Sequence, residues 1–382
     1  MKSAVVAVMA TFAIGSSVPS APAASKTIEL LISADTNIQT LWNTVLIPAF
    51  EKEYPGYKVN VTFDRNGLRD AQTFAKIVAA KETRRDPGVD LIDGGIAVRL
   101  SQAGLLYRPS PSLMPNLKDV SKLLIKQANG TIPYRASTVM LAYNSTKVTK
   151  VPKTLDEVLA WIKANPGKFT YNVPSGGGSG YSFAQTVLDM NLTADERLAM
   201  SLAPNKLIQE KWAKGWDTLR DLNKYTYGKN GTYPANNAAT LNLLATGEID
   251  MGTVWSDQFA SAKAAGTMPA NIKATAIKSP SLTGGPATLG IPINGSNRTG
   301  GRLLANFVLS PAMQNAIMGG TLKGIPVING KKLDQTLFEN FKDIDVTDMR
   351  APYFPANSDD LKSAWSLTVS YTHLTLPTTP YV

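Results

Sequence analysis

Residues 27–63 read TIELLISADTNIQTLWNTVLIPAFEKEYPGYKVNVTF and change twice between the periods of strand and helix. The apolar run 27–33 predicts a short strand. Apolar residues within 38–50 recur at steps of three and four, which predicts a helix with one buried face and a kink at Pro48. The alternating stretch 58–63 predicts a second strand, so the fold opens as a β-α-β unit.

The same alternation continues downstream. Residues 68–78 predict a second amphipathic helix, and 89–92 predict a third strand that ends at Asp93-Gly94-Gly95. Parallel strands need helical crossovers between them, so this order predicts a parallel sheet covered by helices.

The middle of the chain repeats this organisation. Thr154 and Glu157 form a Thr-x-x-Glu capping box, which predicts the start of a helix. Strands are predicted over 169–173 and 249–254, and Gly247 between them predicts the end of a helix. Two α/β lobes in one chain follow from these elements.

The two ends of the chain differ from its body. Residues 1–23 combine Lys2, a short apolar core over 4–14 and small residues before Ala24, which is the layout of a secretory signal peptide. Residues 370–382 carry no Lys, Arg, Asp or Glu and resemble translated sequencing-adapter read-through, so we expect an artefactual tail there. A signal peptide at the N-terminal end predicts export to the bacterial periplasm and removal of residues 1–23.

Composition excludes several classes of protein. The chain has 382 residues, 43% of them apolar and 18% charged, which is typical of a globular protein. It contains no cysteine and one histidine, so a thiolate metal site, a disulfide scaffold and a Cys or His catalyst are not expected. The net charge of +10 is scattered along the chain, whereas a nucleic-acid binder concentrates its basic residues.

Five segments, in this order, resemble the family 1 extracellular solute-binding proteins of ABC importers. They are LIPAFEKEYPGYKVNV (46–61), DLIDG (90–94) with AGLLY (103–107), IPYRASTVMLAYNSTKV (132–148), LATGEIDMGTVWSD (244–257), and LGIPINGSN with ANFVLSPAMQ (289–314). The resemblance spans roughly 26–369 and lies in the group that includes binders of polyamines, ferric iron, thiamine and phosphonates.

The resemblance implies an α/β, periplasmic-binding-protein-like fold of type II, with two lobes joined by a hinge and a central sheet flanked by helices in each. The N-terminal lobe is expected to hold 24–140 and 288–325, and the C-terminal lobe 141–287 and 326–369. The implied function is capture of a small-molecule solute between the lobes and its delivery to the transmembrane subunits of an ABC permease. We expect a monomer without cofactor or metal that binds no nucleic acid.

Solutes of open α/β sheets bind beyond the carboxyl ends of the strands. In the first lobe this rule selects residues that follow the first and third strands. In the second lobe it selects the Gly-rich loop 175–181 and the end of the strand 249–254. The predicted ligand-binding residues are Asp35, Thr36, Gly94, Gly95, Tyr143, Ser175, Gly178, Ser179, Gly180, Tyr181, Trp255 and Asp257.

The loop PSGGGSGYS (174–182) carries the prediction about the solute. Glycines let backbone amides approach a ligand, and the helix that follows directs its positive end to the same place, which suits an anionic group. A flexible Gly/Ser connector is the alternative. Trp255 could stack on a solute or pack within its lobe, and Asp257 could bind the solute or cap a helix.

Positions at which this sequence differs from the family's binding motifs narrow the class of solute that we expect. The carboxylates of polyamine binders and the adjacent tyrosines of ferric binders are absent from this sequence. A small polar organic solute with an anionic group is therefore expected, and thiamine-like and sugar-like solutes stay open. The alternative function is a secreted hydrolase with a Ser/Lys or carboxylate site, since neither needs Cys or His. An adhesion protein would need an aromatic or basic patch that the sequence lacks.

Overall fold

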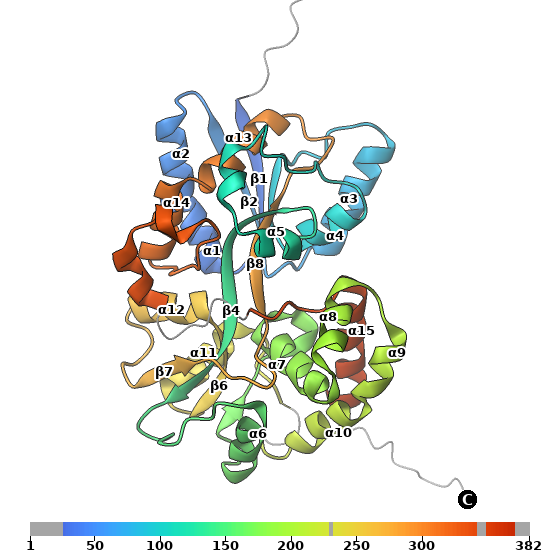
Figure 1. The fold of residues 1–382 in the computed structure, drawn as a ribbon, viewed down its shortest axis with the longest axis vertical. Coiled ribbons are helices and arrows are strands. Elements are labelled where there is room, and N and C mark those ends of the chain that lie inside the picture. The colour runs from blue at the N-terminus through green and yellow to red at the C-terminus, as the bar shows by residue number, and fades with distance from the viewer. Residues whose placement is uncertain (1–25, 229–231, 342–348, 371–382) are drawn as a thin grey trace, which may run out of the picture.

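The computed structural model describes residues 26–228, 232–341 and 349–370. Figure 1 shows two lobes stacked along the long axis of the molecule, with two strands running from one lobe into the other. The expected signal peptide lies outside the described residues, as does the expected tail apart from Ser370. No helix within the described part of the chain is long and apolar enough to cross a membrane.

The sheet of the N-terminal lobe has the order β2-β1-β3-β8-β4. β1 (Thr27–Ala34) lies parallel to β2 (Lys58–Arg65) and to β3 (Leu91–Gly94), as the β-α-β pattern predicts. β8 (Gly284–Gly290) is antiparallel to both β3 and β4 (Ile132–Asn144). The carboxyl ends of the three parallel strands therefore meet at one edge, next to the second lobe.

The sheet of the C-terminal lobe is built on the second half of β4. That half pairs antiparallel with β6 (Met251–Trp255) and β7 (Ile272–Thr275), and β6 pairs parallel with β5 (Phe169–Thr170). The strand expected over 169–173 ends at Thr170, because the chain then turns toward the Gly-rich loop. The mixed α/β architecture expected from the sequence is confirmed.

β4 and β8 form the hinge. The partner of β4 changes between Thr138, which faces Gly284 of β8, and Val139, which faces Trp255 of β6. One continuous strand thus belongs to both sheets, as Figure 1 shows. The chain crosses again near Arg350, between Met349 of the first core and Tyr353 of the second, and Arg350 Nε donates to the Ser281 carbonyl at 2.8 Å.

The boundary expected between residues 325 and 326 lies too early. Val327, Ile328 and Leu333 are buried in the core of the N-terminal lobe, so the segment after 325 still belongs to that lobe. From about Tyr353 the chain belongs to the C-terminal lobe again, because Tyr353 packs in the second core. Apolar side chains decide this boundary, and no local sequence signal marks it.

The helix expected over 38–50 is irregular just before Pro48. α1 (Thr36–Leu41) runs into a π-helical turn, η1 (Trp42–Leu46), and then into α2 (Ile47–Glu53). Pro48 lies in the first turn of α2, directly after the π-helical turn, and has no N–H to donate to the preceding turn. The departure from regular α-helix geometry therefore lies in η1, the π-helical turn before Pro48.

The remaining helices cover the two sheets. In the N-terminal lobe they are α3 (Asp70–Glu82), α4 (Ile96–Gln102), α5 (Lys122–Gln127), α13 (Arg298–Val308) and α14 (Pro311–Gly319). In the C-terminal lobe they are α6 (Leu155–Ala164), α7 (Gly178–Leu188), α8 (Ala194–Leu202), α9 (Lys206–Gln209), α10 (Ala213–Leu222), α11 (Asn237–Thr246), α12 (Ser256–Ala264) and α15 (Pro355–Trp365). Short turns are η2 (Pro115–Asp119), η3 (Pro174–Gly176), η4 (Asp189–Asn191), η5 (Glu210–Trp212), η6 (Gly330–Lys332), η7 (Gln335–Phe341) and η8 (Ser366–Ser370).

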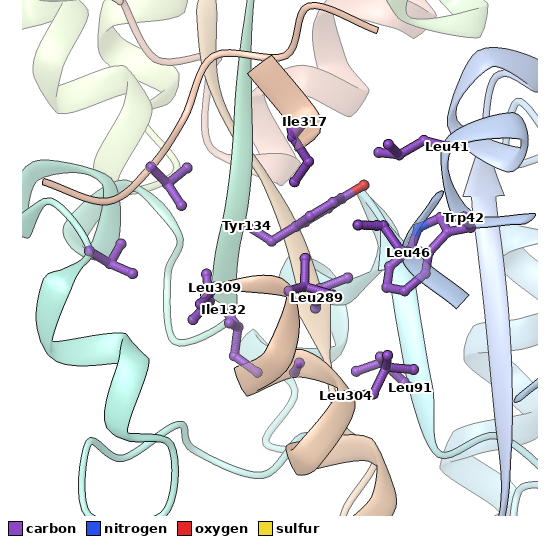
Figure 2. Packing of buried hydrophobic residues seen from close by; sticks show 14 of the residues in the cluster. Leu41, Trp42, Leu46, Leu91, Ile132, Tyr134, Leu289, Leu304, Leu309 and Ile317 are labelled. Atoms are coloured by element: carbon purple, nitrogen blue, oxygen red, sulfur yellow. The ribbon is translucent and has the colours of Figure 1, made fainter. Parts of the chain in front are cut away.

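Each lobe has its own apolar core. In the first, Trp42 and Tyr134 place their ring centroids 5.9 Å apart among aliphatic side chains such as Leu46 and Leu289, as Figure 2 shows. In the second, Tyr171 and Phe183 lie 4.8 Å apart. Separate cores are what two rigid bodies joined by a hinge require.

Candidate functional site

Polar side chains from both lobes meet at the hinge. Asp35 follows β1 in the N-terminal lobe, Arg135 lies on β4, and Asn237 and Asp257 begin α11 and α12 in the C-terminal lobe. We call these four residues the inter-lobe site. Three of them, Arg135, Asn237 and Asp257, are buried.

Arg135 is the centre of this site. Its Nη1 donates to Asp257 Oδ2 at 3.2 Å, and its Nε donates to the Tyr134 hydroxyl at 2.9 Å. Ser137 Oγ donates to the other oxygen of Asp257 at 2.8 Å. Burial lowers the pKa of Arg135, but Tyr134, Asp257 and Asp93 raise it more strongly, so the guanidinium stays charged.

The network continues into the N-terminal core. The Tyr134 hydroxyl and Trp42 Nε1 both donate to Asp93 Oδ2, at 2.6 and 2.7 Å. Burial raises the pKa of Asp93, and Arg135 and these two hydrogen bonds oppose that rise. Trp42, one of the apolar residues of the helix predicted over 38–50, is fully buried and also orients this carboxyl group. Hydrogen bonds thus connect the first core to the second lobe through β4.

Asp35 occupies the N-cap position of α1, yet its side chain does not cap the helix. It faces Asn237 of the opposite lobe, whose amide favours the charged form of the carboxyl group. Burial and the nearby Asp257 raise the pKa of Asp35 to about 6, against the opposing influence of Asn237, Arg135 and Arg65. The fold directs this carboxyl group toward the opposite lobe and not toward the first turn of α1.

The Gly-rich loop is packed more tightly than an open anion nest. The backbone N–H of Ser179 donates to Asn237 Oδ1 at 2.9 Å, and that of Gly180 donates to Asn172 Oδ1 at 2.7 Å. Ser179 Oγ donates to the Thr253 carbonyl at 2.9 Å. Two amides in the first turn of α7 are therefore satisfied by asparagines, and the loop is not a flexible connector.

The glycines of this loop serve close packing. A Cβ at Gly180 would lie 1.7 Å from the Asn172 carbonyl oxygen, and one at Gly178 would lie 2.7 Å from Asn237 Oδ1. Gly178 also has a φ of +72°. Ser175 is exposed in η3 and lies outside this packed turn.

A second inter-lobe contact lies beside α15. Arg99 Nη2 of α4 and Asp359 Oδ2 of α15 are 2.5 Å apart, and both side chains are about half exposed. Next to this ion pair, the Lys362 ammonium lies 5.8 Å from the centroid of the buried Tyr181 ring. Burial lowers the pKa of Lys362, and Asp359 and Asp70 partly offset the effect. The Tyr181 hydroxyl pairs with Ser358 at 2.7 Å.

The other predicted residues divide into two groups. Gly94 and Gly95 end β3 and begin the turn into α4, Thr36 is exposed at the start of α1, and the half-buried Trp255 ends β6. All four lie at strand ends that face the other lobe.

Tyr143 is different. It pairs with Met251 near the far end of β4, six residues beyond Ser137, which corresponds to about 20 Å of strand. The structure therefore does not bring Tyr143 to the inter-lobe site.

Sequence reasoning missed Arg135, Asn237 and Lys362. Arg135 had a signal, because it is the only charged residue in the strand IPYRASTVMLAYN. Asn237 and Lys362 lie on helices whose relation to the hinge depends on tertiary structure. Among the described residues, no group of three or more His, Cys, Asp or Glu could hold a metal ion.

A family model described as bacterial extracellular solute-binding protein matches residues 46–340. The chain therefore belongs to this family, as the sequence motifs predicted. Protein YnjB of Escherichia coli (strain K12) is 25% identical over 271 residues, which cover 68% of this chain and 69% of that protein.

Solved structures share the fold. The solute-binding protein of an ABC transporter from Thermotoga lettingae, bound with α-D-tagatose, has a TM-score of 0.68 at 17% identity and covers 91% of this chain and 96% of its own. AfuA from Actinobacillus pleuropneumoniae, bound with fructose-6-phosphate, has a TM-score of 0.63 at 18% identity and covers 91% of this chain and 100% of its own. Iron-bound HitA from Pseudomonas aeruginosa has a TM-score of 0.60 at 19% identity and covers 90% of this chain and 98% of its own. The family and these neighbours are solute-binding proteins, not enzymes, so the hydrolase alternative is set aside.

Proposed function

We propose that this protein captures a small polar organic solute between its lobes in the periplasm and delivers it to an ABC permease. The observation that carries the proposal is the inter-lobe site, where Asp35 of one lobe meets Asn237 and Asp257 of the other around Arg135. Such groups satisfy a solute only when the lobes are closed, so binding favours closure. Export through the expected signal peptide and a monomeric state complete the proposal.

The expected anionic group of the solute is assigned to the Lys362 side of the site. In the described part of the chain, no hydrogen bond or ion pair within 4 Å reaches the Lys362 ammonium, whereas two amides of the Gly-rich turn are already bonded to asparagines. An anion beside Lys362 would compensate this partly desolvated charge. Basic side chains, rather than the helix N-terminus, therefore support this part of the proposal.

The proposal is tested by a thermal-shift screen against amines, phosphonates, sulfonates, carboxylates, sugars and thiamine, followed by small-angle scattering. A solute at one hundred times its Kd adds about 2.7 kcal/mol to the free energy of unfolding. We expect a shift in Tm together with a smaller radius of gyration. Turnover of a solute, without compaction by any of them, contradicts the proposal.

Trp255 gives a second readout. Its half-buried ring ends β6 at the inter-lobe site, so solute binding should change its fluorescence. We expect Trp255→Ala to raise the Kd by about tenfold or more, since stacked rings contribute both area and geometry. An unchanged Kd would assign Trp255 to lobe packing, and Trp161→Ala on α6 serves as the matched control.

A further inference from the structure

We propose that Arg350 is a positioning residue of the hinge. Its side chain fixes the third inter-lobe segment, residues 349–353, to the C-terminal lobe, so that the lobes rotate about one line of three adjacent chain segments. This inference rests on the proposed function, because closure of the lobes on a solute requires a defined axis. It assigns a role in that closure to an arginine outside the inter-lobe site.

The first support is that the three segments change lobes side by side. β4 changes its partner between Thr138 and Val139, and the Val139 amide donates at 2.9 Å to the carbonyl of Thr283, just before β8. The next amide along that segment, Gly284, donates to the Arg350 carbonyl at 2.9 Å. Backbone hydrogen bonds therefore join the three crossings in one row, with Arg350 at one end of it.

The second support is that the third segment changes lobes within one residue. The Met349 side chain is buried in the core of the N-terminal lobe, and its carbonyl accepts from Gln127 Nε2 of α5 at 3.3 Å. Arg350, the next residue, directs its side chain into the C-terminal lobe, where only 14% of it is exposed. A single junction in the backbone thus separates contacts with one lobe from contacts with the other, as a hinge requires.

The third support is the set of bonds around the Arg350 guanidinium. Its Nη1 pairs with Asp189, a fully buried carboxylate that directly follows α7. Its Nε donates to the Ser281 carbonyl at 2.8 Å, and its Nη2 donates to Thr186 Oγ1 of α7 at 2.6 Å. Because the donors of a guanidinium point in fixed directions, these three bonds hold the segment in both position and orientation.

The residues after Arg350 strengthen the same attachment. The Tyr353 hydroxyl donates to the other oxygen of Asp189 and accepts from Trp212 Nε1 at 3.2 Å. The Tyr353 amide donates to Gln185 Oε1 of α7 at 3.2 Å. Both carboxylate oxygens of Asp189 thus bind the third segment. Since α7 begins with the Gly-rich turn, this attachment also sets the position of that turn relative to the hinge.

The test measures the distance between the lobes in the full chain without solute. The sequence contains no cysteine, so spin labels can be attached specifically to Lys81→Cys on α3 and Lys214→Cys on α10, where both side chains are exposed. We expect Arg350→Lys, which keeps a charge for Asp189 but loses the planar set of donors, to broaden the distribution of label distances. The exchange rate of the Gly284 amide should rise by about tenfold or more, which is the scale of a lost hydrogen bond to a charged group.

Two further variants separate the hinge role from a general effect on stability. Arg350→Met combined with Asp189→Asn leaves no unpaired buried charge and should broaden the label distances as Arg350→Lys does. Leu219→Ala is the control, because it removes a buried side chain from the core of the C-terminal lobe, away from the third segment. It should lower the Tm through the cavity that it creates and leave the label distances unchanged.

The outcomes separate this inference from the proposed function. Unchanged label distances in both Arg350 variants, or equal broadening in Leu219→Ala, overturn the inference. Failure of both Arg350 variants to fold also overturns it, since the residue would then serve the stability of its lobe alone. All of these comparisons use solute-free protein, so they leave the proposed function untouched. That function is contradicted instead if no solute of a broad library shortens the label distance in protein that retains Arg350.

Discussion

Asp35 is the residue whose protonation should be visible in the stability of the free protein. Its pKa of about 6 exceeds the ordinary value of 3.8, so the folded state prefers the neutral acid. The associated stability is fully present below pH 3.8 and is lost as the pH rises through about 6. The difference corresponds to on the order of 3 kcal/mol.

Asp35→Asn should therefore be more stable than the wild type above pH 7 and similar to it near pH 4. Urea unfolding of both proteins across this range measures the difference, which isolates Asp35 from the other buried carboxyl groups. A variant that is less stable than the wild type at pH 7.5 would show that the Asp35 carboxylate supports the fold.

Gly180 should tolerate no side chain. Its Cβ would lie 1.7 Å from the Asn172 carbonyl oxygen, so Gly180→Ala must displace backbone. We expect a loss of about 3 kcal/mol or more in the free energy of unfolding. Gly176→Ala is the control, because no atom lies within 4 Å of its Cβ, and its effect should stay within about 0.5 kcal/mol. Equal stability of the two variants would contradict this packing.

At the scale of elements, β4 places a charge inside the hinge. Removing the guanidinium with Arg135→Met leaves Asp257 without its ion-pair partner and should cost about 3–5 kcal/mol. The double variant Arg135→Met with Asp257→Asn should recover part of this loss, since no unpaired charge remains. Calorimetry or urea unfolding provides the measurement, and strictly additive effects would argue against the pairing.

Local signals predicted several element boundaries correctly. Thr154 Oγ accepts from the Glu157 amide at 3.3 Å, although the Glu157 carboxylate accepts from Lys153 rather than from Thr154. Gly247 ends α11 with a φ of +75°, as a C-cap glycine requires. These features depend on neighbours within a few residues, which is why the sequence alone reveals them.

At the scale of the whole molecule, the Arg99–Asp359 ion pair should bias the lobes toward closure. Exposed pairs contribute about 0–1 kcal/mol, so Arg99→Gln should hardly change the Tm. We expect a larger radius of gyration without solute and a Kd up to about fivefold higher.

Lys206→Gln is the matched control, because it removes an ion pair that lies within the C-terminal lobe. It should leave the radius of gyration unchanged. Identical scattering curves for Arg99→Gln and Lys206→Gln would show that the Arg99 pair has no influence on the lobes.

The sequence by itself determined the α/β class, the first parallel strands and the family, because hydrophobic periods and short motifs act over a few residues. It also indicated Asp35, Trp255 and Asp257, which lie at strand ends. Only the tertiary structure decided that Tyr143 lies away from these residues, that asparagines accept from two amides of the Gly-rich turn, and that Lys362 lies beside the Tyr181 ring. Those relations depend on tertiary contacts, such as Ser179 with Asn237 and Lys362 with Tyr181, and packing of the whole chain fixes such contacts.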